Sequence, residues 1–194
     1  MSRSGRGRFV WLISAGFSLL PASLGAQAQD RVCERGSFSP LVRLVGEWEV
    51  RAEDRRTDLT FESSTGRAAI SMALDGCGLV ERFSGTRQGK PYSTLSVLVL
   101  TADGQLELAR ADSEHGGLTV AFGPLESNVA TLIWKRDLGT RILSTRTTYT
   151  VESSDSFRVE RRLQRSESEE WEVTYRGSYR RASPSPNPST PNKR

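Results

Sequence analysis

Short stretches of alternating polar and apolar residues follow one another from Trp48 to Arg181 with little interruption. They recur about every ten to twelve residues, and turn signals such as Asp103-Gly104 separate them. Short antiparallel strands joined by tight turns form an up-and-down meander, and closure into a barrel removes its unpaired edges. The sequence therefore predicts an all-β fold, a single antiparallel up-and-down β-barrel of about ten strands.

The boundaries of the expected strands follow the alternation and the turn residues. The strands are expected at 48–53, 58–63, 68–74, 79–84, 93–100, 105–111, 118–122, 129–136, 141–151, 156–165 and 170–181. Ser39 to Gly46 has the pattern of a short helix, since Ser39 suits an N-cap, Pro40 the first helical position and Gly46 the end. We expect this helix to lie across one mouth of the barrel.

Residues 1–28 have the pattern of a secretory signal peptide. Three arginines precede an apolar stretch from Phe9 to Leu20, and the small residues Ala26 and Ala28 suit cleavage before Gln29. A membrane anchor is the alternative, but about a dozen apolar residues are too few to cross ~30 Å of hydrocarbon. We therefore expect an exported protein, periplasmic or extracellular, without a membrane span.

The rest of the chain divides into three parts. Residues 29–45 form an N-terminal segment with the short helix, and residues 46–181 form the barrel. Residues 182–194 contain four prolines and no large apolar side chain, a composition typical of a disordered tail. Without residues 1–28, 24 basic and 23 acidic side chains remain, so charge gives no reason to expect binding to nucleic acid.

Cys33 and Cys77 are the two cysteines of the chain. An even number in an oxidising compartment favours a Cys33–Cys77 disulfide, which would tie the segment before the first strand to the middle of the sheet. Buried free thiols are the alternative. With no Cys-x-x-Cys pair and one histidine in the sequence, we expect no metal site.

Glu81 and Arg161 each share a strand face with apolar residues. Their neighbours on those faces are Leu79, Phe83, Phe157, Val159 and Leu163. One face of the last strand carries Trp171, Val173, Tyr175, Gly177 and Tyr179. A buried charge is costly unless it is paired, so Glu81 and Arg161 either pair with each other or contact a polar ligand group, or a bulge or mouth position leaves each in water.

Several motifs stand out between Ser37 and Arg181. They are Gly46-Glu-Trp-Glu-Val50, Asp75-Gly-Cys-Gly-Leu-Val-Glu-Arg-Phe-Ser-Gly85, Ala111-Asp-Ser113, Arg146-Thr-Thr-Tyr149 and Tyr175-Arg-Gly-Ser-Tyr-Arg180. Together they resemble an uncharacterised family of exported, mostly bacterial, lipocalin-like domains. The resemblance implies a calycin-like barrel, as in lipocalins and fatty-acid-binding proteins, and no established enzyme activity. Residues 106–112 lack the aromatic side chains that such proteins often carry there, which argues against a shared ligand.

The Gly-x-Trp element that ends at Trp48 is also similar to the lipocalin motif that packs the closed end of the barrel. The similarity implies a structural role for Trp48, with its indole N–H satisfied against a neighbouring arginine. Contact with a ligand is the alternative role.

We predict that the barrel binds a small apolar or amphipathic molecule, such as a lipid, in its interior. The expected wall residues are Leu79, Phe83, Phe157, Val159, Trp171 and Tyr175, with Glu81 and Arg161 for polar contacts. The alternative is a filled barrel with a structural or assembly role that acts through its surface, since most of these residues would also form a filled core.

Haem binding and catalysis have less support. Haem binding, by analogy with barrels such as nitrobindin, needs an axial ligand, and the one histidine, His115, lies in a glycine-rich turn. The sequence has no Gly-x-Ser-x-Gly elbow, Cys–His pair or phosphate loop, which leaves carboxylates such as Glu81 and Asp112 as the one conceivable catalytic pair. We therefore expect neither an enzyme nor a bound cofactor.

Overall fold

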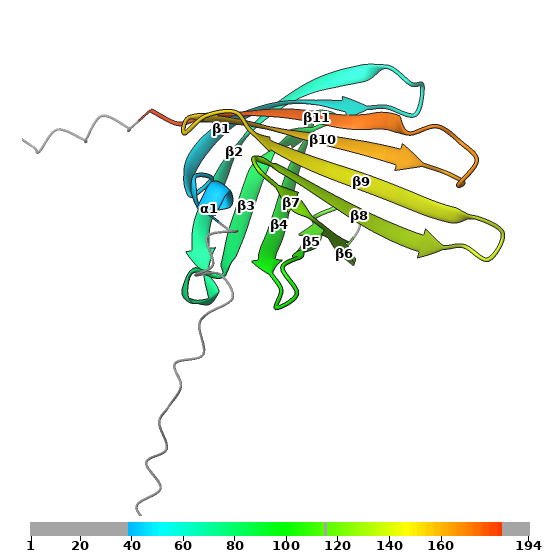
Figure 1. Cartoon of the computed structure of the whole chain (residues 1–194). Coiled ribbons are helices and arrows are strands. Elements are labelled where there is room, and N and C mark those ends of the chain that lie inside the picture. The colour runs from blue at the N-terminus through cyan, green and yellow to red at the C-terminus, as the bar shows by residue number, and fades with distance from the viewer. Residues whose placement is uncertain (1–38, 115, 184–194) are drawn as a thin grey trace, which may run out of the picture.

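The structure is a computed structural model that describes residues 39–114 and 116–183 (Figure 1). The expected signal peptide, Cys33, His115 and all but the first two residues of the expected tail lie outside the described residues. The Cys33–Cys77 disulfide therefore stays a prediction. No helix in the described ranges is long and apolar enough to cross a membrane.

One antiparallel sheet of eleven strands forms the molecule. Except for β6 and β7, strands that follow one another in the chain are neighbours in the sheet, and β1 pairs with β11. The pair Phe122↔Ile133 between β6 and β8 closes the sheet into a barrel of ten strands, with the two-residue β7 as an extra strand. The strands are β1 Gly46–Arg55, β2 Phe61–Ala73, β3 Gly78–Arg87, β4 Lys90–Leu100, β5 Leu106–Asp112, β6 Leu118–Gly123, β7 Leu125–Glu126, β8 Val129–Asp137, β9 Ile142–Val151, β10 Ser156–Gln164 and β11 Glu172–Arg181. The predicted all-β, up-and-down barrel is confirmed.

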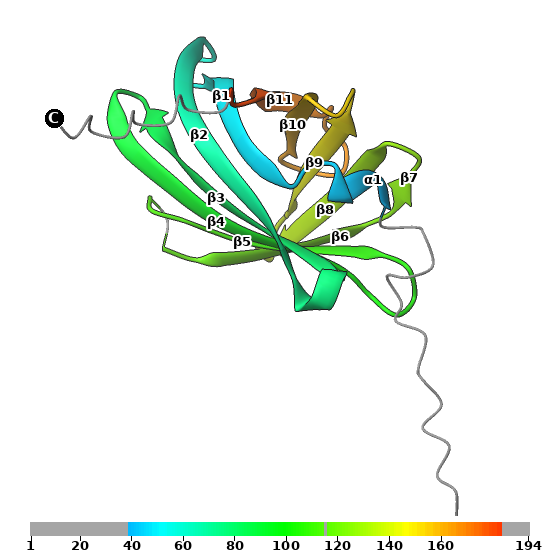
Figure 2. The same ribbon diagram turned by 90° about the vertical axis from the view of Figure 1, so that its left-hand side faces the viewer.

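The helix α1, Ser39–Val42, is four residues long and lies near one end of the barrel (Figure 2). It is shorter than the expected 39–46 because the chain turns after Val42 to enter β1 at Gly46. Leu41 and the following Leu44 are fully buried in the core. We call this end the closed end and the opposite end, where β1 meets β2 and β10 meets β11, the mouth.

Trp48 is the largest side chain in the core of the closed end, where it is 1 % exposed. Its indole Nε1–H donates a 2.7 Å hydrogen bond to the Leu44 carbonyl, and its ring meets Phe157 edge-on at 4.8 Å. Tyr179 stacks on Phe157 at 4.1 Å. The expected arginine is Arg181, but its guanidinium lies 4.5 Å above the indole ring and leaves the N–H to Leu44. These contacts hold α1, β1, β10 and β11 together.

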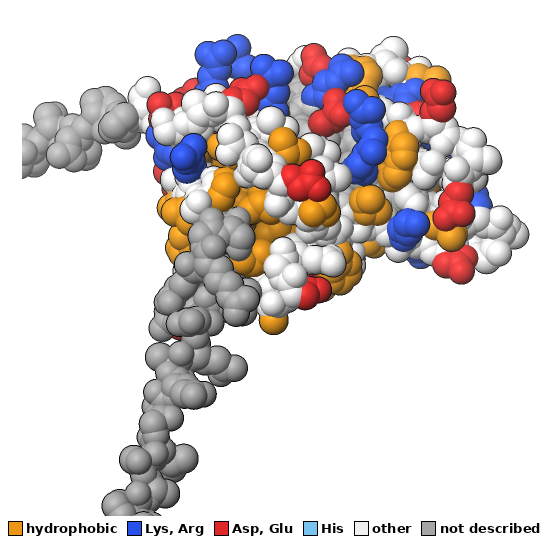
Figure 3. Space-filling model, viewed as in Figure 1, with side chains coloured by type: hydrophobic (Ala, Val, Ile, Leu, Met, Phe, Trp, Pro, Cys, Tyr) orange, Lys and Arg blue, Asp and Glu red, His pale blue; other side chains and the backbone are white. Residues whose placement is uncertain are grey.

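The closed end is apolar on its outside as well. Figure 3 shows hydrophobic side chains gathered around α1, and Val42, Met72 and Leu74 at this end are 43 %, 39 % and 62 % exposed. Charged side chains dominate the mouth, as described below. The two ends of the barrel therefore offer different chemistry to a partner or ligand.

A single long strand, β2, replaces two of the expected strands. The sequence around Gly66 has the composition of a turn, but Gly66 lies inside β2 and pairs with both Val50 and Gly85. A Cβ atom there would lie 2.5 Å from Cζ of Phe83, so the glycine makes room for the Phe83 ring. The expected boundary between 58–63 and 68–74 was wrong because this glycine serves packing instead of a turn.

A β-bulge interrupts the pairing of β10 with β11. Arg161 pairs with Tyr175, but the next residue, Arg162, pairs with Val173. Thr174 is therefore an extra residue in β11, and the side chains on its two sides no longer follow one alternation.

The bulge turns Trp171 away from the lumen. The prediction that Trp171 and Val173 share the inner face with Tyr175 is wrong, because both residues precede the bulge. The Trp171 ring instead lies under the guanidinium of Arg146, at 4.5 Å, on the outer side of the barrel.

Candidate functional site

An open depression of about 450 Å³ lies at the mouth, among the ends of β1, β3, β10 and β11. Its lining is basic, with two leucines and two threonines between the arginines. The lining residues are Arg55, Arg56, Thr57, Leu59, Arg87, Arg161, Leu163, Arg165 and Thr174. Most ligand pockets have volumes between about 300 and 1,000 Å³, so the depression is large enough for a small organic molecule.

Most of the arginines at the mouth are paired with carboxylates. The ion pairs and their N–O distances are Arg55–Glu172 2.9 Å, Arg165–Glu172 2.6 Å, Arg56–Glu62 3.5 Å, Arg87–Asp54 3.2 Å and Arg87–Glu114 2.7 Å. Arg161 is the exception, since it forms no ion pair within residues 39–114 and 116–183.

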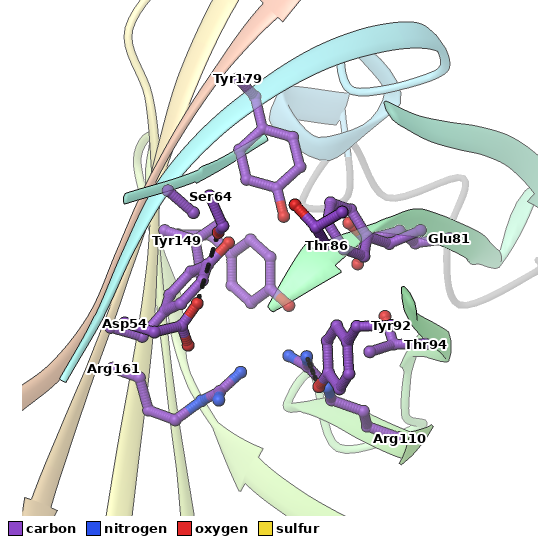
Figure 4. A pocket seen from close by; sticks show the side chains of 14 residues that line it. Asp54, Ser64, Glu81, Thr86, Tyr92, Thr94, Arg110, Tyr149, Arg161 and Tyr179 are labelled. Atoms are coloured by element: carbon purple, nitrogen blue, oxygen red, sulfur yellow. Dashed lines mark hydrogen bonds between the residues drawn. The ribbon is translucent and has the colours of Figure 1, made fainter. Parts of the chain in front are cut away.

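Below Arg161 the lumen narrows to a polar cavity of about 20 Å³, room for about one water molecule. Figure 4 shows tyrosine, arginine and carboxylate side chains that converge on it from opposite walls of the barrel. The polar side chains that line it are Asp54, Ser64, Glu81, Thr86, Tyr92, Thr94, Arg110, Tyr149, Arg161, Tyr175 and Tyr179. This half of the barrel interior is therefore not a hydrophobic core.

Arg110 on β5 and Arg161 on β10 face each other across the polar cavity (Figure 4). Arg110 Nη2 donates a 3.3 Å hydrogen bond to the Tyr92 hydroxyl, and the Arg161 guanidinium lies 5.2 Å from the centre of the Tyr175 ring. Burial lowers the pKa of Arg161, and the positive charge of Arg110 lowers it further. The two like charges therefore repel each other in the same cavity.

Asp54 and Glu81 are the acidic side chains of this cavity. Asp54 forms the ion pair with Arg87 and accepts a 3.5 Å hydrogen bond from Ser64. Burial raises the pKa of the Glu81 carboxyl, and the charge of Arg110 and the Tyr179 hydroxyl oppose that rise only in part. In the described chain no ion pair joins Glu81 to either arginine, so of the alternatives considered for Glu81 and Arg161 direct pairing is not found, whereas Arg161 does lie at the mouth, next to a bulge.

A second cavity of about 20 Å³ lies toward the closed end. Its lining is apolar except for Glu81, Ser96 and Tyr149. The apolar residues are Leu44, Ile70, Leu79, Leu98 and Leu108. Glu81 and Tyr149 line both cavities and form the boundary between the polar and the apolar half of the lumen.

The structure brings most of the sequence-predicted site residues to the lumen. Glu81, Phe83, Val159, Arg161 and Tyr175 line the polar cavity, and Leu79 lines the apolar one. Phe157 belongs to the packed closed end instead. Trp171 lies on the outer face, as described above.

Sequence reasoning missed Arg110, Tyr149 and Asp54. Each lies on the inner face of its strand, and strict alternation identifies them: Arg110 follows Leu106 and Leu108 at spacings of two, as Arg161 follows Phe157 and Val159. The same test that singled out Arg161 would have singled out Arg110.

The Glu81→Gln variant is expected to be more stable than the wild type at pH 7. Because the pKa of Glu81 is raised on folding, the folded protein holds this proton more tightly than the unfolded chain, whose value is 4.5. Wild-type stability is therefore lost as the pH rises from 4.5 through the folded pKa, and glutamine, which mimics the protonated acid, avoids the loss. Urea unfolding from pH 4.5 to 7 should show a gap between the two proteins that closes toward pH 4.5.

Glu49→Gln, on the exposed face of β1, is the control and should follow the wild type at every pH. A Glu81→Gln variant less stable than the wild type at pH 7 would mean that ionised Glu81 neutralises an arginine in the folded protein.

Among the similar solved structures, one supports the barrel fold. No curated protein matches the chain in sequence. The crystal structure of Rv2717c from M. tuberculosis is 14 % identical, with a TM-score of 0.52 over 76 % of this chain and 98 % of that one, and shares the fold. The S-type phycobiliprotein lyase CPES from Guillardia theta is 10 % identical, with a TM-score of 0.48 over 74 % of this chain and 91 % of that one. A redesigned β-barrel, mFAP1, bound to DFHBI, is 14 % identical, with a TM-score of 0.43 over 72 % and 96 %.

The model of one protein family matches the sequence over residues 38–181, a range that includes α1 and the whole barrel. The chain thus belongs to DUF1579, a family of proteins of unknown function.

Proposed function

We propose that this protein binds a small molecule at the mouth of its barrel and that it acts by binding, not by catalysis. The supporting observation is the open depression of about 450 Å³, which leads through Arg161 into a lumen lined by charged side chains and tyrosines. Binding sites are typically concave, with a few converging polar groups that fix the orientation of the ligand.

The volumes argue for a short ligand over a long acyl chain. Each cavity inside the barrel has about 20 Å³, room for about one water molecule, whereas the depression has about 450 Å³. The body of the ligand therefore lies in the depression, and a polar group reaches the lumen. Among apolar and amphipathic molecules, this favours small amphipathic ones.

The signal-peptide pattern of residues 1–28 supports export, so the ligand would be met in the periplasm or outside the cell. A Cys33–Cys77 disulfide suits that location. The lipocalin-like character of the domain belongs to the same proposal, since lipocalin barrels hold one small ligand in their interior.

A filled barrel that acts through its surface is the second candidate. The small volume of both interior cavities favours it, because the lumen is nearly closed by its own side chains. The two candidates differ in one respect that can be measured: only the first has a ligand at the mouth.

The test is a thermal-stability screen of the full chain against a library of charged and neutral small molecules, with native mass spectrometry of the freshly exported protein. Ligands that bind the folded state raise Tm. Leu163→Trp, which places a bulkier side chain in the depression, should reduce the shifts, and Thr148→Trp, on the outer face of β9, should leave them unchanged. If no compound raises Tm and the exported protein carries no small molecule, the result favours the second candidate, a filled barrel that acts through its surface.

A further inference from the structure

We propose that the ligand is an anion and that its carboxylate, or another small oxoanion group, is held between the guanidinium groups of Arg110 and Arg161. This inference rests on the proposed function and specifies the chemistry of the same site. It follows from four observations: the placement of the two arginines, their partners, the neighbouring acids and the available volume.

The two guanidinium groups converge on one small space. Arg110 comes from β5 and Arg161 from β10, on opposite walls of the barrel, and both line the polar cavity (Figure 4). Each guanidinium presents its N–H donors in a planar fork, which matches the two oxygens of a carboxylate or phosphate. An oxoanion between the two forks would contact both at once.

The partners of these arginines set them apart from the others at the mouth. Arg55, Arg56, Arg87 and Arg165 all have a carboxylate within ion-pairing distance. Within the described ranges, Arg110 has a tyrosine hydroxyl as its hydrogen-bond partner, and Arg161 has the face of an aromatic ring. Both side chains are partly buried, and two like charges that share a cavity without an ion pair repel each other, so an anion between them lowers that cost.

Neither acid of the cavity forms an ion pair with Arg110 or Arg161 in the described chain. Asp54 is engaged by Arg87 and Ser64 on its own side of the cavity. Glu81 lies at the apolar boundary, where burial favours its neutral form. An external anion can therefore contact both guanidinium groups without displacing a carboxylate from an ion pair with either of them.

The volume of the polar cavity limits which part of the ligand can enter it. The polar cavity of about 20 Å³ has room for about one water molecule, so one oxygen of the carboxylate can take that place while the rest of the molecule extends past Arg161 into the depression. Leu59 and Leu163 give that depression two apolar contacts among its polar ones. A short-chain organic acid fits this arrangement, and a free inorganic oxoanion would use the same two arginines.

The experiment measures the binding of acetate, hexanoate and inorganic phosphate to the full chain by calorimetry and thermal stability, at a fixed chloride concentration. Hexanamide, the neutral analogue of hexanoate, is the control ligand. Hexanoate is expected to bind and to raise Tm, and hexanamide is not. Tighter binding of hexanoate than of acetate and phosphate identifies an organic acid as the ligand, and equal or tighter binding of phosphate identifies a free oxoanion.

Arg110→Met and Arg161→Met should each weaken anion binding by about ten-fold or more, since each removes a charged hydrogen-bonding partner. Arg161→Lys keeps the charge but not the planar fork of N–H donors, so its affinity for the anion should lie between that of these variants and that of the wild type. Arg162→Met, the neighbour of Arg161 on the outer face, should bind as the wild type does. The melting curve of each variant confirms that it is folded.

The proposal is overturned if no anion binds, if hexanamide binds as well as hexanoate, or if the Arg110 and Arg161 variants keep full affinity. If a neutral ligand binds to Arg161→Met but not to Leu163→Trp, the ligand is not an anion. The proposed binding site at the mouth would still stand. Absence of any ligand, charged or neutral, would reject the proposed function as well.

Discussion

Replacing Trp48 with alanine is expected to lower the free energy of unfolding by about 3–5 kcal/mol. The indole is 1 % exposed, and its removal leaves a cavity among α1, β1, β10 and β11. It also leaves the Leu44 carbonyl without its 2.7 Å hydrogen bond and Phe157 without its edge-on partner. Since α1 is four residues long and contributes only Leu41 to the core, with Leu44 following it in the chain, this end should loosen first. Guanidinium unfolding monitored by tyrosine fluorescence and circular dichroism measures the loss.

Trp171→Ala is the matched control. Trp171 also has an arginine 4.5 Å above its ring, but it lies on the outer face and is only half-buried. Its removal should cost about 1 kcal/mol or less, the value of an exposed cation–π contact. Equal losses in the two variants would contradict the structural role of Trp48, because burial is the property that separates them.

Arg161→Met is expected to raise the free energy of unfolding of the ligand-free protein by about 1–3 kcal/mol. Methionine has a similar length, is flexible enough to fill the space and brings no charge into the cavity. The variant removes the repulsion with Arg110 and the cost of burying a guanidinium that has no ion pair in the described chain. A gain in stability together with a loss of ligand binding is typical of a residue retained for function.

Arg162→Met tests whether the expected rise in the free energy of unfolding comes from removing a charge inside the lumen. Arg162 lies next in the chain but on the outer face, where its Nε contacts Glu160 at 2.6 Å. Exposed pairs of this kind contribute about 0–1 kcal/mol, so this variant should be unchanged or slightly less stable. If Arg161→Met proves clearly less stable than the wild type, Arg161 is a structural residue whose contacts outweigh its repulsion with Arg110. Chemical unfolding at pH 7 in the absence of added anions decides between these outcomes.

The sequence predicts the barrel well because successive side chains of a strand point to opposite faces, and this two-residue period is visible in the sequence. Each strand in a barrel alternates between solvent and lumen, so polar and apolar residues alternate wherever the lumen is apolar. The same alternation identified Glu81 and Arg161 as charges on inner faces, and the structure places both in the lumen. Arg110 follows the same rule but was overlooked, although Leu106 and Leu108 precede it on its face.

The parts that the sequence did not predict depend on contacts between distant segments. Gly66 resembles a turn residue until the Phe83 ring is placed beside it. The bulge at Thr174 depends on how β11 pairs with β10, and nothing in its own residues signals it. Whether Arg161 has an ion-pair partner likewise depends on which arginines at the mouth lie close to a carboxylate, and only the three-dimensional arrangement determines this.

The closure of the barrel at β6 and β8 bears on how large a ligand can enter. The ladder between these strands in the described chain has one pair, Phe122↔Ile133, whereas β1 and β2 pair along ten positions from Gly46↔Ile70 to Arg55↔Phe61. Ladder hydrogen bonds fix the circumference of a barrel, and toward the mouth β6 and β8 lack them. The entrance can therefore widen by parting these two strands while every other ladder stays intact. We therefore expect the amide hydrogens along β6 and β8 to exchange with solvent before those of β1 and β2, because less hydrogen bonding holds these two strands together.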